Sequence, residues 1–194
     1  AMSTLDEEDR REYYRIEDMT ALEIRPLSAL EAAGQEVLQD ASPLFNLLSE
    51  LHLSEFESQH LLRQISERDR NLAAFLKSQN KRIDLLSQVI AITVLGQIGV
   101  PQPVIISEGG IDFQHPTPIA ADARLSIKLV LMPQALGLLL RARVTHCDRK
   151  GEGFDVGTEF EHLTDAQRQL LARYILQRQA QERRLARELN ESGI

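Results

Sequence analysis

The feature that most constrains this fold is the run of residues 55–95, which contains neither proline nor glycine. A mean α-helix has about 11–12 residues, so a run of this length without a helix breaker is unusual. Apolar residues recur along it at alternating spacings of three and four, which is the period of a helix with one apolar seam. The run therefore predicts a long helix, and the helical pattern extends over residues 28–100.

The apolar seam of this helix predicts self-association. Its members are Leu62, Ile65, Leu72, Leu76, Ile83, Leu86 and Ile90. Asp69 and Gln79 interrupt the seam, and polar residues at such positions cost stability but can set register and oligomer number. Because charged residues flank the seam, we expect a homo-oligomer, either a dimer or a tetramer. The alternative is a helix packed on its own domain, and Ala73, Ala74 and Phe75 widen the apolar face as that alternative requires.

On both sides of the helical segment the apolar period changes to two, which predicts strands. One strand, over residues 20–27, precedes the helical segment. The strands that follow it are expected at residues 104–106, 111–115, 124–132, 138–147 and 154–161. Thr164 and Gln167 have the spacing of a capping box that begins a C-terminal helix. The predicted fold class is α+β, a small antiparallel barrel closed by a C-terminal helix and interrupted by a helical insertion.

The same changes in pattern predict the organisation of the chain. Residues 1–18 are expected to form a flexible charged arm, and residues 180–194 a charged helical tail. The barrel with its closing helix takes residues 19–27 and 101–179, and the helical insertion for oligomerisation takes residues 28–100.

Composition excludes several kinds of function. The formal net charge of −7 disfavours binding of a nucleic acid polymer, which needs a broad basic face. The single cysteine, Cys147, excludes an intramolecular disulfide framework and a multi-cysteine metal site. The most apolar stretch, residues 85–100, is too short and too polar for a membrane span, and no signal peptide is evident, so we expect a cytoplasmic protein.

No pattern in the sequence predicts catalysis. The five histidines have no metal-ligand spacing, and no serine or cysteine stands in the order of a nucleophilic triad. A phosphate-binding P-loop and a G-x-G-x-x-G motif are both missing from the sequence. We therefore expect no enzyme, no metal and no cofactor.

Three segments together resemble the PilZ domain family. Residues 10–16 resemble its Arg-x-x-x-Arg element, and residues 105–110 lie where the family has Asp/Asn-x-Ser-x-x-Gly. Residues 154–175 are similar to its last strand and C-terminal helix. The resemblance covers residues 9–27 and 101–179, and the stretch between them resembles the helical insertion through which a subset of PilZ proteins oligomerises.

The resemblance implies a receptor for the second messenger cyclic-di-GMP, with an unidentified protein downstream. It assigns ligand binding to Arg10, Arg11, Arg15, Ser107, Gly109 and Gly110. The planar fork of arginine can hydrogen-bond a phosphate or guanine O6 and N7, or stack on a base. Read without the resemblance, the arginines are solvated charges paired with acidic residues of the arm, and residues 107–110 are a hairpin turn.

One position departs from the family pattern. Ile105 stands where the family has Asp or Asn, whose side chain accepts hydrogen bonds from a guanine edge or orders the turn. Loss of such a buried pairing costs about 1–3 kcal/mol, or roughly tenfold to hundredfold in Kd. Binding is then weakened, supported by another acceptor such as Glu108 or Asp112, or lost. If it is lost, the chain is an adaptor, a PilZ-like scaffold for protein–protein interaction.

Overall fold

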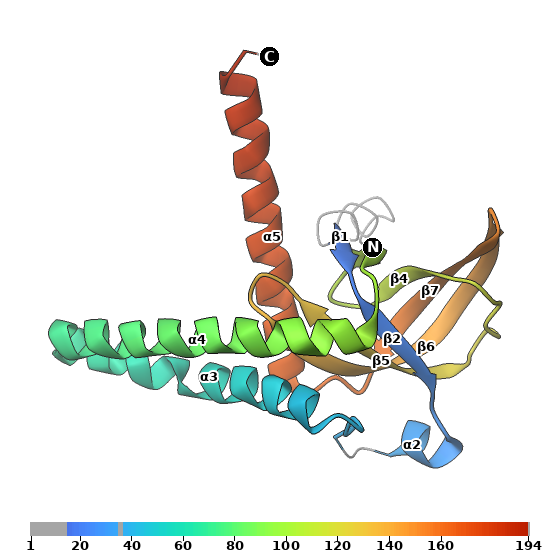
Figure 1. Cartoon of the computed structure of the whole chain (residues 1–194), viewed down its shortest axis with the longest axis horizontal. Helices are drawn as coiled ribbons and strands as arrows, with labels where there is room; N and C mark the ends of the chain where they lie inside the picture. Colours follow the sequence, from blue (N-terminus) through green and yellow to red (C-terminus); the bar gives the residue numbers. More distant parts are fainter. Residues whose placement is uncertain (1–14, 35–36, 194) are drawn as a thin grey trace, which may run out of the picture. The chain divides into compact units, whose positions relative to one another are not determined.

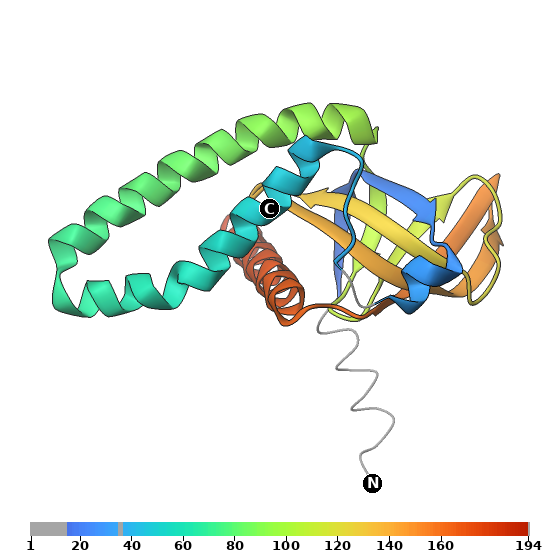
Figure 2. The same cartoon turned by 90° about the horizontal axis from the view of Figure 1, so that it is seen from below.

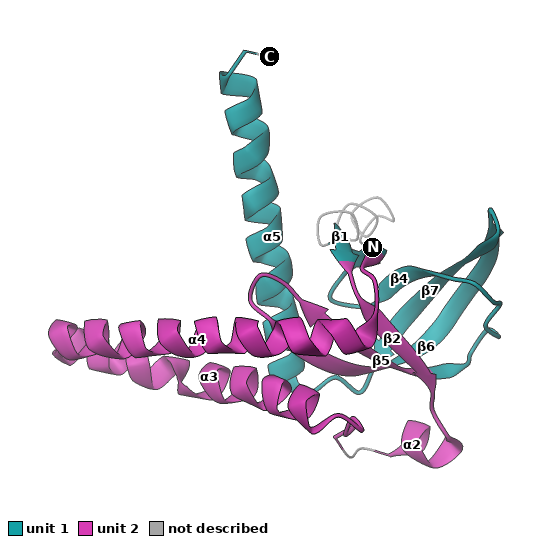
Figure 3. Cartoon of the chain, viewed as in Figure 1, with its two compact units in different colours: residues 1–19, 103–124, 142–194 teal, residues 20–102, 125–141 magenta. Residues whose placement is uncertain are grey.

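The computed structural model describes residues 15–34 and 37–193, and it divides into two compact units (Figure 3). Unit 1 comprises residues 1–19, 103–124 and 142–194, and unit 2 comprises residues 20–102 and 125–141. Seven strands form one hydrogen-bonded sheet in the order β1-β3-β4-β7-β6-β5-β2. β6 (Leu136–Lys150) contributes residues to both units. The predicted α+β class, with a helical insertion and a C-terminal helix, is confirmed (Figure 1).

Unit 1 holds three strands that follow the helical insertion, β3 (Gln102–Ile106), β4 (Ile111–His115) and β7 (Gly153–Glu161). It also holds most of β1 (Ile16–Thr20), which precedes the insertion. β4 pairs antiparallel with β3 on one side and with β7 on the other. Apolar residues at alternate positions, such as Ile106, Ile111 and Phe113, are buried, as the period of two predicts.

The C-terminal helix α5 (Asp165–Glu191) begins at the predicted capping box. The Thr164 hydroxyl accepts from the Gln167 amide at 3.1 Å, and the Gln167 side chain accepts from the Thr164 amide at 3.1 Å. The buried side chains Leu170, Leu171, Tyr174 and Ile175 all lie in its first half. Residues 180–193 are exposed.

The strand expected over residues 20–27 is present as β2, and a strand that the sequence did not predict, β1, precedes it. β1 ends at Thr20, and β2 (Leu22–Pro26) follows the buried Ala21 and pairs antiparallel with β5 (Arg124–Leu131). Residues 16–18, which we expected in the flexible arm, belong to β1. The pattern hid this strand because only Ile16 among its inward positions is apolar, whereas Thr20 and much of Asp18 are also shielded from solvent.

The expected single helix through residues 55–95 is also two helices, α3 (Pro43–Arg68) and α4 (Arg70–Ile98), which contact each other. Asp69 between them is extended, with φ −146° and ψ 99°, and its carboxylate accepts from the Leu72 amide at 3.1 Å. Figure 2 shows the chain reversing direction where the two helices meet. Aspartate is a strong N-cap because it satisfies an amide that the helix leaves unpaired. Asp69 is therefore a helix boundary and not a polar member of a continuous seam.

Unit 2 is built on its own apolar cluster. Phe45 and Leu48 of α3, Ala91 and Val94 of α4, and Val130 and Ala135 near β5 are buried together. The buried His52 adds a hydrogen bond between its Nε2 and the Ala135 carbonyl oxygen at 2.8 Å.

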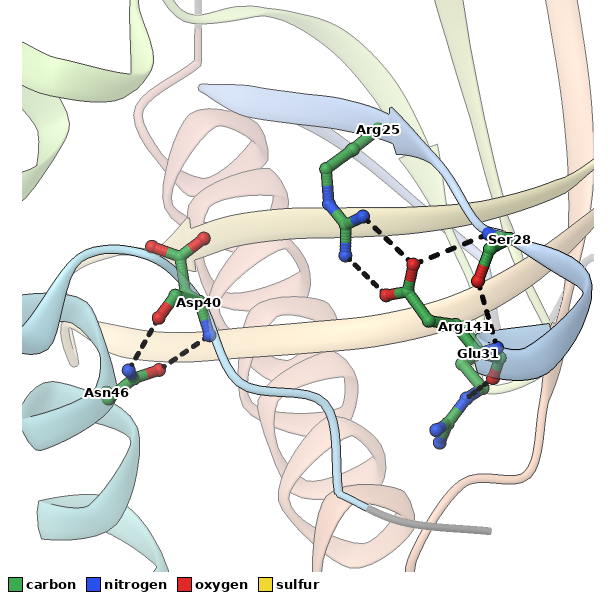
Figure 4. A network of polar contacts seen from close by, with 6 residues as sticks. All are labelled: Arg25, Ser28, Glu31, Asp40, Asn46 and Arg141. Atoms are coloured by element: carbon green, nitrogen blue, oxygen red, sulfur yellow. Dashed lines mark hydrogen bonds and ion pairs between the residues drawn. The ribbon is translucent and has the colours of Figure 1, made fainter. Parts of the chain in front are cut away.

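Polar contacts hold the segment around the short helix α2 (Ala29–Ala33) in unit 2 (Figure 4). Ser28 and Glu31 form a capping box, and Arg25 donates to the Glu31 carboxylate at 2.8 Å. The hydrogen bond from Arg25 lowers the pKa of Glu31 to about 2. Arg141 donates from Nε to the Glu31 carbonyl oxygen at 3.2 Å. These contacts tie α2 to strands of the same unit.

A second polar contact lies at the start of α3. Asp40 exchanges two hydrogen bonds with Asn46 (Figure 4) and pairs with Lys128 of β5 at 2.9 Å. Both side chains of the pair are largely buried, at 8% exposure for Lys128 and 14% for Asp40. Burial alone would raise the pKa of Asp40, but the hydrogen bond from Lys128 and those from the backbone outweigh it and lower the pKa.

Candidate functional site

The candidate site is a pocket in unit 1 with a volume of about 790 Å³. Small-molecule sites typically have volumes of about 300–1,000 Å³. β1, β3, β4 and β7 supply most of the lining, with one residue each from the end of β6 and from α5. The lining residues are Glu17, Asp18, Met19, Pro103, Val104, Ile105, Asp112, Phe113, Gln114, Lys150, Asp155 and Arg178.

The pocket brings four carboxylates and two cations together. Of these, Asp18 is firmly held, because it accepts a hydrogen bond from the Tyr174 hydroxyl and pairs with Arg178 at 3.2 Å. Burial of the Tyr174 hydroxyl and its hydrogen bond to Asp18 raise the pKa of the tyrosine. This cluster links β1 to α5 within unit 1. Arg178, one of the two cations that line the pocket, is therefore already paired with Asp18.

Asp112 is in a different environment. Its side chain is partly buried, and burial raises its pKa. His146 and Arg15 oppose the rise through their charges, Asp155 adds to it, and a hydrogen bond from the Thr158 backbone opposes it. Among residues 15–34 and 37–193, no cation lies within ion-pair distance of Asp112. A carboxylate so placed keeps its capacity to accept hydrogen bonds from a ligand.

Apolar side chains form the other part of the lining. Ile105 is 36% exposed and Met19 is 61% exposed, although both lie in strands. Val104 and Phe113, their neighbours in the lining, are buried. Exposed apolar side chains beside acceptor groups suit a flat ligand that has an apolar face and a polar edge.

The predicted motif residues 107–110 form the turn between β3 and β4. The Ser107 hydroxyl accepts from the Gly109 amide at 3.2 Å and the Gly110 amide at 3.1 Å, and it donates to the Gly110 carbonyl oxygen at 3.3 Å. A Cβ at Gly110 would overlap the Thr158 carbonyl oxygen of β7. Ser107, Gly109 and Gly110 are not among the residues that line the pocket. Their geometry thus has a structural purpose independent of any ligand.

The three predicted arginines are only partly placed. Arg15 precedes β1, is exposed, and is near enough for its charge to lower the pKa of Asp112. Arg10 and Arg11 lie outside the described residues. Arg15 is not among the residues that line the pocket, so binding by the three arginines stays a prediction.

The predicted seam residues are divided between the two helices. Leu62 and Ile65 are on α3, and Leu72, Leu76, Ile83, Leu86 and Ile90 are on α4. The exposed large apolar residues of α4 are Leu72, Phe75, Ile83, Leu85, Leu86, Val89 and Ile92. The use of this surface for self-association stays a prediction.

Sequence reasoning missed several residues of the pocket. Asp18 was placed in the arm, and Arg178 fell within the closing helix without an assigned role. Asp155 carried a usable signal, since it occupies a polar position in the alternating strand Phe154–Glu161. Asp112 was named only as a substitute acceptor, and the structure places it in the pocket.

The structure also bears on the expected exclusions. In the described part of the chain, no group of three or more His, Cys, Asp or Glu side chains is arranged to hold a metal ion. None of the described helices has the length and apolar character that crossing a membrane requires.

Comparison with solved structures finds one structure with the same fold and a second, partial match. A tetrameric PilZ-domain protein from Xanthomonas campestris, self-assembled via a helical bundle, matches with 16% identity, a TM-score of 0.53 and coverage of 87% of each chain. The Bacillus subtilis inhibitor of motility (MotI/DgrA) matches with 21% identity over 43% of this chain and 44% of that one, at a TM-score of 0.38. No curated protein matches the sequence.

The family comparison covers most of the residues that line the pocket. The model of the PilZ domain matches residues 76–177, which is more than half of the chain. This range includes β3, β4 and β7, the turn at Ser107–Gly110 and the first half of α5. The chain belongs to the PilZ domain family, a family of cyclic-di-GMP receptor and adaptor domains.

Proposed function

We propose that this chain is a non-enzymatic, cytoplasmic bacterial receptor for cyclic-di-GMP, which binds in the pocket of unit 1 and is gripped by Arg10, Arg11 and Arg15. The observation that carries the proposal is the pocket itself, because it lies beside the family's ligand-binding turn and includes position 105. The receptor has no cofactor. It passes the signal to a downstream protein.

The chemistry of the ligand supports this proposal. Cyclic-di-GMP has two phosphates, which need cations, and two guanines, which offer flat apolar faces and polar edges. Arg15 and Lys150 supply positive charge at the pocket, and Ile105 and Met19 supply apolar contact for a base. Arginine is the more versatile of the two cations, since its guanidinium can pair with a phosphate in bidentate fashion or stack on a base.

Isothermal titration calorimetry with cyclic-di-GMP tests the proposal. We expect wild-type protein to bind and Arg11→Ala/Arg15→Ala to bind roughly tenfold to hundredfold more weakly, since charge-assisted pairings to phosphate are lost. Arg184→Ala/Arg187→Ala, on the exposed end of α5, removes the same charge and is the matched control. Absence of heat from the wild type at tens of micromolar ligand rejects the receptor. Equal binding by both double variants rejects the arginine site.

A second candidate function has its own observation in its favour. The pocket is lined by more carboxylates than cations, and Ile105 replaces the family's acceptor, so a dianionic ligand meets repulsion there. In this alternative the chain is an adaptor that has lost the nucleotide and serves as a scaffold for other proteins. The same titration separates the two functions, because an adaptor gives no heat with cyclic-di-GMP.

The helices supply the second part of the proposal, assembly into a homo-oligomer. Seven large apolar side chains of α4 are exposed, and residues such as Leu86 (63%), Val89 (63%) and Ile92 (68%) would be covered by a partner helix. Isolated apolar residues on a surface are ordinary, whereas several on one helix indicate an interaction surface. We therefore propose that α4 packs against copies of itself in a dimer or tetramer.

A further inference from the structure

The structure offers a replacement for the acceptor that position 105 lacks. β3 and β4 pair antiparallel, and the register places Asp112 directly opposite Ile105. Side chains of directly opposite residues project from the same face of a sheet, with Cβ atoms about 4.5–5.5 Å apart. Both residues line the same pocket. A carboxylate at 112 therefore reaches the region that a side chain at 105 would address, from the neighbouring strand.

A carboxylate also has the right chemistry to recognise guanine. Ionised aspartate only accepts hydrogen bonds, and its two oxygens can take two donors side by side. The Watson–Crick edge of guanine presents two adjacent donors, N1–H and the exocyclic amino group. Adenine presents one donor beside the N1 acceptor, which a carboxylate repels. Buried polar groups discriminate strongly against a ligand that leaves them unpaired.

The surroundings of Asp112 leave this capacity unused. Asp18 in the same pocket is already taken by Tyr174 and Arg178. In the described ranges, Asp112 has no ion-pair partner, and a hydrogen bond from the Thr158 backbone reaches its carboxylate. Partial burial strengthens any hydrogen bond that a ligand makes to this carboxylate, because water competes less well there.

We propose that Asp112 is the guanine-reading acceptor of this receptor, transferred across the β3–β4 ladder from position 105. This inference rests on the proposed binding of cyclic-di-GMP and names the residue that sets its base specificity. It also explains how a PilZ domain with isoleucine at position 105 can still recognise a guanine edge.

Calorimetric titration of cyclic-di-GMP and cyclic-di-AMP into four proteins tests the inference. They are the wild type, Asp112→Asn, Asp148→Asn and Ile105→Asp/Asp112→Asn. Asp148 is the matched control, because it is an exposed aspartate of β6 that does not line the pocket. We expect Asp112→Asn to weaken cyclic-di-GMP binding roughly tenfold to hundredfold. Asp148→Asn should change the affinity by about twofold or less, and adding Ile105→Asp to Asp112→Asn should restore at least half of the lost factor on a logarithmic scale.

A pH series gives a readout that a structural role for Asp112 would not share. Burial raises the pKa of Asp112, with Asp155 adding to the rise and His146, Arg15 and the Thr158 backbone opposing it. Protonation removes an acceptor, so wild-type affinity should fall as the pH decreases through this raised pKa. The slope of affinity against pH should become flatter in Asp112→Asn and should stay as in the wild type in His146→Gln. The same burial disfavours the ionised form in the folded state, so Asp112→Asn should unfold at a temperature no lower than the wild type.

The outcomes separate the two levels of the proposal. No binding of cyclic-di-GMP by the wild type overturns the receptor function and this inference with it. Binding by the wild type with equal affinity in Asp112→Asn overturns the inference and leaves the receptor standing. Equal losses in Asp112→Asn and Asp148→Asn also overturn it, because charge in general and not position would then control binding. No recovery of affinity in Ile105→Asp/Asp112→Asn overturns it as well.

Discussion

The two units use buried charge in different ways. In unit 2 the least exposed charged side chains, Lys128 and Asp40, are paired at 2.9 Å, and Asp40 has further hydrogen bonds to Asn46 and Ser42. In the pocket of unit 1, Asp112 is partly buried, and no cation among the described residues lies within ion-pair distance of it. Removing one partner of a buried ion pair destabilises the fold. A partly buried acceptor without an ion-pair partner is instead a candidate ligand-binding group. The pocket of unit 1 thus contains one partly buried carboxylate that is paired, Asp18, and one that has no ion-pair partner among the described residues, Asp112, whereas Asp40 of unit 2 is paired.

The largest effect on stability is expected from removing one partner of the buried ion pair of unit 2. Asp40→Ala leaves Lys128 largely buried without its counter-charge, which typically costs about 3–5 kcal/mol. The free energy of unfolding, measured by urea denaturation, should fall by that amount. Because the pKa of Asp40 is lowered in the fold, the wild-type contribution should be present at neutral pH and lost as the pH falls through the pKa of Asp40.

A double variant controls for this loss. Asp40→Leu/Lys128→Met replaces both charges with apolar groups, and such replacements are often neutral or stabilising. It should recover most of the stability lost in Asp40→Ala. An Asp40→Ala protein as stable as the wild type would show that the pair has little structural importance.

A smaller effect is expected at the turn of unit 1, where the fold and the ligand motif coincide. An alanine Cβ at position 110 would overlap the Thr158 carbonyl oxygen, and overpacking of this kind costs about 1–3 kcal/mol. Gly109→Ala is the matched control, since its Cβ would meet nothing closer than the Ser107 hydroxyl at 3.9 Å. Thermal unfolding should show a clear loss for Gly110→Ala and little change for Gly109→Ala. Equal melting temperatures of the two variants would contradict the close approach of β7.

The smallest effect on stability, but a large one on assembly, is expected on α4. Leu86→Glu/Val89→Glu places charge where the proposed partner helix packs, so the oligomer should dissociate. Exposed substitutions of this kind usually change stability by about 0.5 kcal/mol or less. Leu30→Glu is the control, because Leu30 is 87% exposed and lies on α2. Light scattering measures the molar mass of each protein in solution. A monomer mass for the wild type would reject the proposed assembly.

The strands of unit 1 could be predicted because their apolar residues alternate and turn residues separate them. β4 was predicted with its observed bounds, residues 111–115, and the capping box at Thr164 located the start of α5. β1 could not be recognised, because its inward residue Asp18 is neutralised by Tyr174 and Arg178, which lie far away in the sequence. Pattern analysis considers neighbours along the chain and cannot anticipate such partners.

The boundary at Asp69 was missed for a related reason. An aspartate at a seam position of a long amphipathic run is consistent with a polar residue in a coiled coil and with a cap between two helices. Tertiary packing of α3 on α4 selects the second. Part of the candidate site could be predicted, since the missing acceptor at Ile105 was visible in the sequence. The proposed replacement acceptor, Asp112, depends on the register of β3 and β4, which the sequence alone leaves open.

The tight turn at Ser107 and Gly110 has a consequence for how such sequences evolve and are classified. Since the serine hydroxyl closes the turn and the glycine makes room for β7, selection for folding alone would retain both residues after every trace of nucleotide affinity had gone. The Ser-x-x-Gly signature then marks ancestry and not activity. To distinguish receptors from family members that no longer bind the nucleotide, one must ask whether position 105 or the residue opposite it on the next strand has a hydrogen-bond acceptor.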